Sequence, residues 1–343
     1  MAAAFGLDPM DERYDLTNLR VNLEVELPAM GCSVVYYPPA TTAGSCGYLS
    51  RNLDFPIDIS IADVMQLPLP ADDRKQMASI FCEPFIMEWY PKDGGYASLA
   101  IHAFDTLTGT VDGMNSAGLV VAQLTDESAL AELGPDLEVH PGLPQAVGLN
   151  ELQVLRFLLD TCATAEEAKE ALLTSKQYYG FAPLHYIVAD RAGNSFIYER
   201  STGRNVQYII DGSGQPQVVT NFQIQKHPAA DQMPKEPPTW ESNAFWRYQV
   251  LAERIAEQKG LFTADDVKGH NGCVNYMKVI EEMWADPSYE GDAADDVVRT
   301  LWHSLYDQQA GTAEFSFYLG DEVGADGTRT ERRSDYLRFG LEG

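Results

Sequence analysis

Short apolar runs separated by turn residues are the main pattern along this chain of 343 residues. The run Cys32–Tyr37 is β-branched and aromatic, and Pro38–Gly47 is rich in turn residues. Tyr48–Phe55 then carries apolar side chains at even spacing, which is typical of one face of a strand. The pattern therefore predicts a β-hairpin over Gly31–Phe55.

Further apolar and β-branched runs lie between turn signals and predict additional strands. Pro91–Gly95 is a hairpin signal, and a tight turn is predicted over Gly113–Gly118. The predicted strands cover residues 79–90, 96–104, 108–112, 118–124, 184–189, 195–200, 206–210, 218–221, 297–307 and 314–319.

Two amphipathic helices are predicted in the middle of the chain. The first covers Asn150–Leu159 with a capping box from Asn150 to Gln153, and the second opens with the box Thr164–Glu167 and continues to Leu173. Helical patterns return over residues 243–258 and 263–283. This order of elements favours antiparallel sheets with helices on their outer faces over regular βαβ winding.

Residues 1–31 form a distinct leader. The spacing of two from Leu19 to Leu27 suggests a strand, and Gly31 stands directly before Cys32. A small residue before a candidate nucleophile suggests processing at this bond. The alternative is an ordinary N-terminal strand and turn, which this evidence alone favours.

Composition narrows the class of protein. Hydrophobic residues make up 45% of the chain, so it should be globular. The net charge of −27 argues against nucleic-acid and anionic-membrane partners, and favours small-molecule substrates. Five cysteines without a CxxC pair or metal-type spacing, and no signal peptide, predict free thiols in the cytoplasm and no metal or other cofactor.

Cys32 is the strongest chemical candidate. A thiolate needs a cation or base beside it, and the predicted hairpin brings Arg51 and Asp54 near this thiol. The alternatives are a buried, inert Cys32 and a cross-strand salt bridge between Arg51 and Asp54. None of the six histidines stands in a nucleophile–histidine motif. The α-amine of Cys32, if it were freed, has an ordinary pKa that suits a base at neutral pH.

Several segments together resemble a known family. They are Gly31-Cys32-Ser33, 51–55 (Arg-Asn-Leu-Asp-Phe), 112–122 (Asp-Gly-Met-Asn-Ser-Ala-Gly-Leu-Val-Val-Ala), 219–222 (Val-Thr-Asn-Phe) and 242–247 (Ser-Asn-Ala-Phe-Trp-Arg). In order and spacing they are similar to the cysteine N-terminal-nucleophile (Ntn) hydrolases. That group includes choloylglycine (bile salt) hydrolases, penicillin V acylases and acyl-coenzyme A:6-aminopenicillanic acid acyltransferases. Ser50 replaces the family's usual glycine before the arginine.

The resemblance implies an α+β fold, an αββα sandwich of two mainly antiparallel sheets flanked by helices. It would comprise a leader, residues 1–31, and a single domain, residues 32–343. Autocleavage at the Gly31–Cys32 bond would free the amine that serves as base.

The resemblance also implies catalytic roles. Cys32 would be the nucleophile, Arg51 would tune its thiol, and Asp54 would bind its amine. Asn221 would donate to the oxyanion, and Arg247 would complete the charged cluster. The family's second asparagine falls near Thr125, whose hydroxyl would replace it in the oxyanion or substrate site.

The implied activity is hydrolysis of a linear amide of an N-acyl small molecule, through a thioester on Cys32 and without a cofactor. A homo-oligomer is compatible with this activity. Two alternatives stay open, an acyltransferase on the same site and a catalytically silent binding protein with the same fold. Candidate acyl-pocket residues, which could equally be core, are Met65, Phe81, Phe85, Met87, Trp89 and Tyr90.

Overall fold

The computed structural model describes a large part of the chain from residue 31 onward. The described residues are 31–57, 70, 73, 83–92, 94–103, 109–126, 148–175, 177–178, 183–201, 206–227, 233, 243–285, 298–325 and 329–341. The strand predicted in the leader, the start of the strand predicted over 79–90, and the pocket candidates Met65 and Phe81 lie outside these residues.

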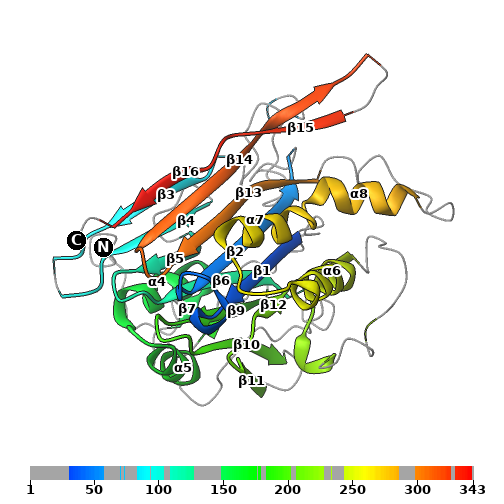
Figure 1. Ribbon diagram of the computed structural model, residues 1–343. Coiled ribbons are helices and arrows are strands. Elements are labelled where there is room, and N and C mark those ends of the chain that lie inside the picture. Colours follow the sequence, from blue (N-terminus) through cyan, green and yellow to red (C-terminus); the bar gives the residue numbers. More distant parts are fainter. Residues whose placement is uncertain are drawn as a thin grey trace.

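Two seven-stranded antiparallel sheets form the centre of the fold (Figure 1). The first has the order β12 (Gln217–Val219), β1 (Gly31–Tyr37), β2 (Tyr48–Pro56), β13 (Val298–Asp307), β14 (Thr312–Val323) and β15 (Arg329–Arg333), with β16 (Leu337–Gly340) also on β14. The second has the order β11 (Val206–Asp211), β10 (Ser195–Ser201), β9 (Leu184–Ala189), β6 (Val120–Thr125), β5 (Thr110–Asn115), β4 (Ser98–His102) and β3 (Phe85–Trp89). A short parallel pair joins β7 (Leu149–Asn150) to β8 (Gln177–Tyr178).

Helices cover the outer face of each sheet. On the second sheet lie α4 (Glu151–Thr161) and α5 (Ala165–Thr174), and on the first lie α6 (Asn243–Glu257), α7 (Ala264–Gly272) and α8 (Tyr276–Ala285). The largest apolar cluster fills the space between the sheets, where Val34 and Leu53 meet Ile101 and Val120. The four layers are therefore helices, sheet, sheet and helices, which confirms the predicted αββα sandwich.

The capping boxes in the sequence predicted the starts of the two mid-chain helices correctly. The Thr164 hydroxyl accepts from the Glu167 N–H at 3.2 Å, and a Glu167 carboxylate oxygen accepts from the Thr164 N–H at 3.1 Å. At α4, the Gln153 side chain accepts from the Asn150 N–H at 3.1 Å. Each bond satisfies an N–H group at a helix start that has no partner inside the helix.

The tight turn predicted over Gly113–Gly118 is present but begins later than predicted, because β5 continues to Asn115. The Asn115 side-chain oxygen accepts from the N–H groups of Ala117 and Leu119 at 3.1 and 3.0 Å. This closes the turn over fewer residues, and Gly118 takes the positive φ of 86° that the turn needs. The strand β14 is longer than predicted, and β15 was not predicted. Together they extend as a hairpin beyond the helices (Figure 1).

The predicted hairpin of Gly31–Phe55 is confirmed as β1 and β2. Its register sets Cys32 opposite Leu53 and Gly31 opposite Asp54. Arg51 lies opposite Val34. Since side chains alternate along a strand, Arg51 and Asp54 project from opposite faces of β2. Arg51 enters the space between the sheets with Cys32, whereas Asp54 faces the helical layer.

Candidate active site

The thiol of Cys32 is buried between the sheets and touches one cation. Arg51 Nη2 lies 3.2 Å from Cys32 Sγ, and both side chains are almost completely buried. The alternative of a salt bridge between Arg51 and Asp54 is excluded, because the two side chains point to opposite faces of the sheet. Arg51 pairs instead with Asp112 of the second sheet, its Nη1 lying 2.7 Å from Asp112 Oδ2.

The main chain of Cys32 is held by two residues that are distant in the sequence. Its N–H donates to Asn221 Oδ1 at 2.7 Å, and its carbonyl oxygen accepts from Arg247 Nη1. Arg247 Nη2 donates to the same Asn221 oxygen at 2.8 Å. Asn221 Nδ2 in turn donates to the Thr125 carbonyl at 2.9 Å. The predicted residues Asn221 and Arg247 therefore meet at Cys32, and Thr125 contacts Asn221 through its main chain rather than its hydroxyl.

Asp54 lies on the other side of the same backbone segment. Its Oδ1 accepts from the Thr300 hydroxyl at 2.5 Å, while its buried Oδ2 has no hydrogen-bond partner among the described residues. A Cβ placed on Gly31 would lie 2.8 Å from Asp54 Oδ2. The free carboxylate oxygen is therefore next to the Gly31–Cys32 segment.

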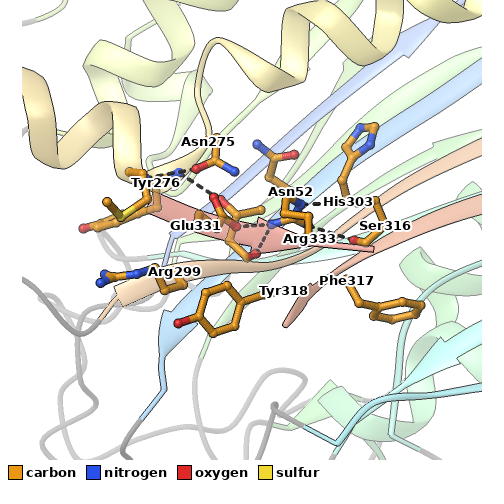
Figure 2. Close-up of polar contacts among 12 residues, drawn as sticks. Asn52, Asn275, Tyr276, Arg299, His303, Ser316, Phe317, Tyr318, Glu331 and Arg333 are labelled. Atoms are coloured by element: carbon orange, nitrogen blue, oxygen red, sulfur yellow. Dashed lines mark hydrogen bonds and ion pairs between the residues drawn. The ribbon is translucent and has the colours of Figure 1, made fainter. Parts of the chain in front are cut away.

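Thr300 is fixed from two directions. Its hydroxyl accepts from the N–H of Tyr276 at the start of α8, at 2.9 Å, and its carbonyl accepts from Arg333 Nη1 at 2.5 Å. Figure 2 shows Tyr276 at the start of this helix and Arg333 reaching across the strands toward Ser316. Sequence reasoning missed Thr300, because no local pattern shows that β13 pairs with β2 and sets Thr300 opposite Asp54.

Burial dominates the electrostatics of the thiol. It raises the pKa of Cys32 above its ordinary value, although the neighbouring Arg51 and Arg247 lower it. In the uncut chain the thiol is therefore protonated near neutral pH. No described hydrogen bond of Cys32 involves a histidine.

Burial also raises the pKa of Asp54, against the lowering effects of Arg247 and Thr300. A carboxyl with a raised folded-state pKa contributes stability at low pH that is lost as pH rises above its unfolded-state pKa. In the uncut Cys32→Ala chain, Asp54→Asn should therefore increase the free energy of unfolding more at pH 7.5 than at pH 5. Urea unfolding of both chains at the two pH values measures this difference, and an equal gain at both would contradict it.

The pocket candidates on β3 are less buried than a closed pocket requires. Phe85 and Met87 are half-buried, whereas Trp89 and Tyr90 are 44% and 46% exposed. The described residues contain no cluster of three or more His, Cys, Asp or Glu side chains suited to a metal ion. Nor does any described helix have the length and hydropathy needed to cross a membrane.

Comparison with known proteins agrees with the fold. The sequence model of the acyl-coenzyme A:6-aminopenicillanic acid acyl-transferase family matches residues 41–321. A search of curated proteins gives no significant match.

Solved structures with the same fold are distant in sequence. The penicillin V acylase from Agrobacterium tumefaciens is 18% identical, with a TM-score of 0.50 over 83% of this chain and 82% of that one. A mutant of the conjugated bile acid hydrolase from Clostridium perfringens is 14% identical, with a TM-score of 0.57 over 90% and 97%. These similarities confirm the Ntn-hydrolase fold.

Proposed function

Because this chain belongs to the acyl-coenzyme A:6-aminopenicillanic acid acyl-transferase family, we propose that it hydrolyses a linear amide of an N-acyl small molecule through Cys32. One observation carries the proposal. The Cys32 thiol contacts Arg51, while Asn221 and Arg247 surround the main chain of the same residue. Cations and an amide side chain around one thiol are suited to acyl transfer.

The base in this proposal is the α-amine of Cys32. The free amine takes the thiol proton, and the thiolate attacks the amide carbonyl carbon. Asn221, and the Thr125 hydroxyl as a second donor, stabilise the resulting oxyanion. The ammonium then protonates the leaving nitrogen, the C–N bond breaks, and a thioester and a free amine remain. Water attacks the thioester with the same amine as base, which releases a carboxylic acid and restores the thiol.

The amine has to be produced by cutting the Gly31–Cys32 bond. In this step the Cys32 sulfur attacks the Gly31 carbonyl carbon and gives up its proton, the C–N bond breaks, and the departing nitrogen takes up that proton. The acyl group of the leader thus moves from nitrogen to sulfur and leaves a free amine. Water hydrolyses that thioester, which leaves a leader ending in a carboxylate and a chain beginning at Cys32. The unpartnered Oδ2 of Asp54 supports this proposal, because it lies where a new ammonium group would need a counter-charge.

Gly31 itself should be required for cleavage. A Cβ there would lie 2.8 and 2.9 Å from Asp54 Oδ2 and Cβ and 3.2 Å from Tyr276 Cε2. Gly31→Val should therefore displace Asp54 and leave most of the protein uncut in intact-mass spectra. Gly269→Ala is the matched control, because its Cβ would meet nothing within 4 Å. Complete cleavage of Gly31→Val would show that the close approach to Asp54 is not needed.

Acyl transfer to an amine is the second candidate, and the acyl-transferase activity in the family's name favours it. Purified protein should be incubated with conjugated bile salts, penicillin V, N-acyl amino acids and N-acyl ethanolamines, each with and without an added amine. Released amine with free acid indicates hydrolysis, whereas a new N-acyl product indicates acyl transfer. A lack of turnover of all four classes by fully cut protein would argue against both.

A further inference from the structure

We propose that Asp112 is a positioning residue that aims the Arg51 guanidinium at the Cys32 thiol. The inference rests on the proposed function, because it assigns a partner to the cation beside the proposed nucleophile. Asp112 opens the Asp-Gly-Met-Asn segment of β5, in the sheet opposite the hairpin. Its side chain therefore reaches Arg51 across the space between the sheets.

The two oxygens of Asp112 have separate partners. Oδ2 accepts from Arg51 Nη1 at 2.7 Å. Oδ1 accepts from the hydroxyls of Ser304 and Tyr306 at 3.1 and 2.5 Å. Both hydroxyls come from β13, the strand next to the hairpin, and Ser304 lies directly opposite Arg51 in that pairing. The carboxylate is thus fixed by the same sheet that carries the guanidinium.

The two terminal nitrogens of the Arg51 guanidinium contact different groups. Nη1 faces Asp112 and Nη2 faces Cys32 Sγ, while the Cζ atom lies 5.7 Å from the centre of the Trp302 ring. A planar guanidinium held at one end by a carboxylate has its other end aimed in a fixed direction. Fixing Nη1 on Asp112 therefore fixes where Nη2 points.

Charge and burial also indicate that Asp112 holds the Arg51 guanidinium in place. Asp112 and Arg51 are both almost fully buried, and a buried cation without a partner is strongly unfavourable. Without the carboxylate, the guanidinium would turn toward other acceptors and away from the thiol. Asp112 is not among the charges with the largest direct effects on the pKa of Cys32, which include Arg51. Removing Asp112 should therefore act on the thiol through Arg51.

The test compares Asp112→Asn with Asp321→Asn. Asp321 forms a pair of the same kind with buried Arg299, at 2.5 Å, away from Cys32. For each variant, the cut protein gives kcat and KM, and alkylation of Cys32 by iodoacetamide between pH 5 and 10 gives the titration midpoint of the thiol by peptide mass mapping. We expect Asp112→Asn to lower kcat about 10- to 100-fold with KM changed less than about twofold, and to raise the midpoint. Asp321→Asn should change neither.

A wild-type midpoint in Asp112→Asn, or an equal rise in Asp321→Asn, would overturn the assignment. If Asp112→Asn does not fold, the double variant Ser304→Ala/Tyr306→Phe tests the same point, because it keeps the ion pair but frees Oδ1. It should raise the midpoint less, and no rise would again overturn the assignment. The alkylation midpoint can be measured without turnover. Failure of the proposed function, seen as an inactive wild-type protein, is therefore distinguishable from failure of this inference.

Discussion

Cys32→Ala is expected to stay uncut and to lose amide hydrolysis by at least about 10⁴-fold. The sulfur is the proposed attacking atom in both reactions, and alanine offers neither a nucleophile nor a thioester. The side chain is small and 4% exposed, so the change leaves only a small cavity and the fold should persist. Intact mass reports cleavage, released amine reports turnover, and circular dichroism reports folding.

Cys162→Ala is the matched control for this prediction. Cys162 is another buried free cysteine, located at the end of α4 and away from Arg51 and Asn221. Its replacement removes the same side-chain volume as Cys32→Ala but should leave cleavage and turnover unchanged. A folded Cys32→Ala protein that turns over substrate at the wild-type rate would exclude a Cys32 mechanism. A protein that binds N-acyl ligands but whose native Cys32 is not alkylated would be a binding protein instead.

Asn221→Ala is expected to lower kcat by about 10²- to 10³-fold, the range seen when an oxyanion donor is removed. The variant also loses the acceptor for the Cys32 N–H and for Arg247, so cleavage of the leader should slow as well. The rate must therefore be normalised to the cut fraction, measured by intact mass.

Asn271→Ala controls for the loss of a buried amide side chain. Asn271 is fully buried on α7, and its side-chain atoms have no hydrogen-bond partner among the described residues. This variant should keep the wild-type kcat. A decrease in kcat of similar size in both variants would mean that Asn221 acts through the stability of the fold rather than on the transition state.

Local patterns in the sequence predicted the hairpin, the mid-chain helices and antiparallel sheets with helices on their outer faces, whereas the four-layer sandwich was implied by the family resemblance. Period-two spacing and turn residues are local signals that extend over only a few positions. Cys32, Arg51 and Asp54 could be brought together because they share one hairpin. The separation of Arg51 and Asp54 by three positions already implied opposite faces, although the cross-strand pairing of the two was considered. Only the alternation of side chains along β2 was needed to reject it.

Distant contacts could not be derived in this way. Asn221 lies 189 positions from Cys32, and Arg247 lies 215 positions away, so only the family resemblance pointed to them. Asp112 belonged to a quoted segment but received no role, because nothing local shows that β5 faces Arg51 across the sandwich. A charged residue next to an apolar run was the available signal.

The long-range hydrogen bonds to Cys32 connect the proposed cleavage of the Gly31–Cys32 bond with the folding of the chain. Asn221 and Arg247 reach Cys32 only after the first sheet and α6 have assembled, since Asn221 follows β12 of that sheet and Arg247 lies on that helix. In an unfolded chain the Gly31–Cys32 bond is an ordinary peptide bond with no groups around it. If this bond is cut as we propose, its cleavage would act as a folding check on each molecule. A misassembled chain would keep its leader and, without a free amine, could not act on a substrate.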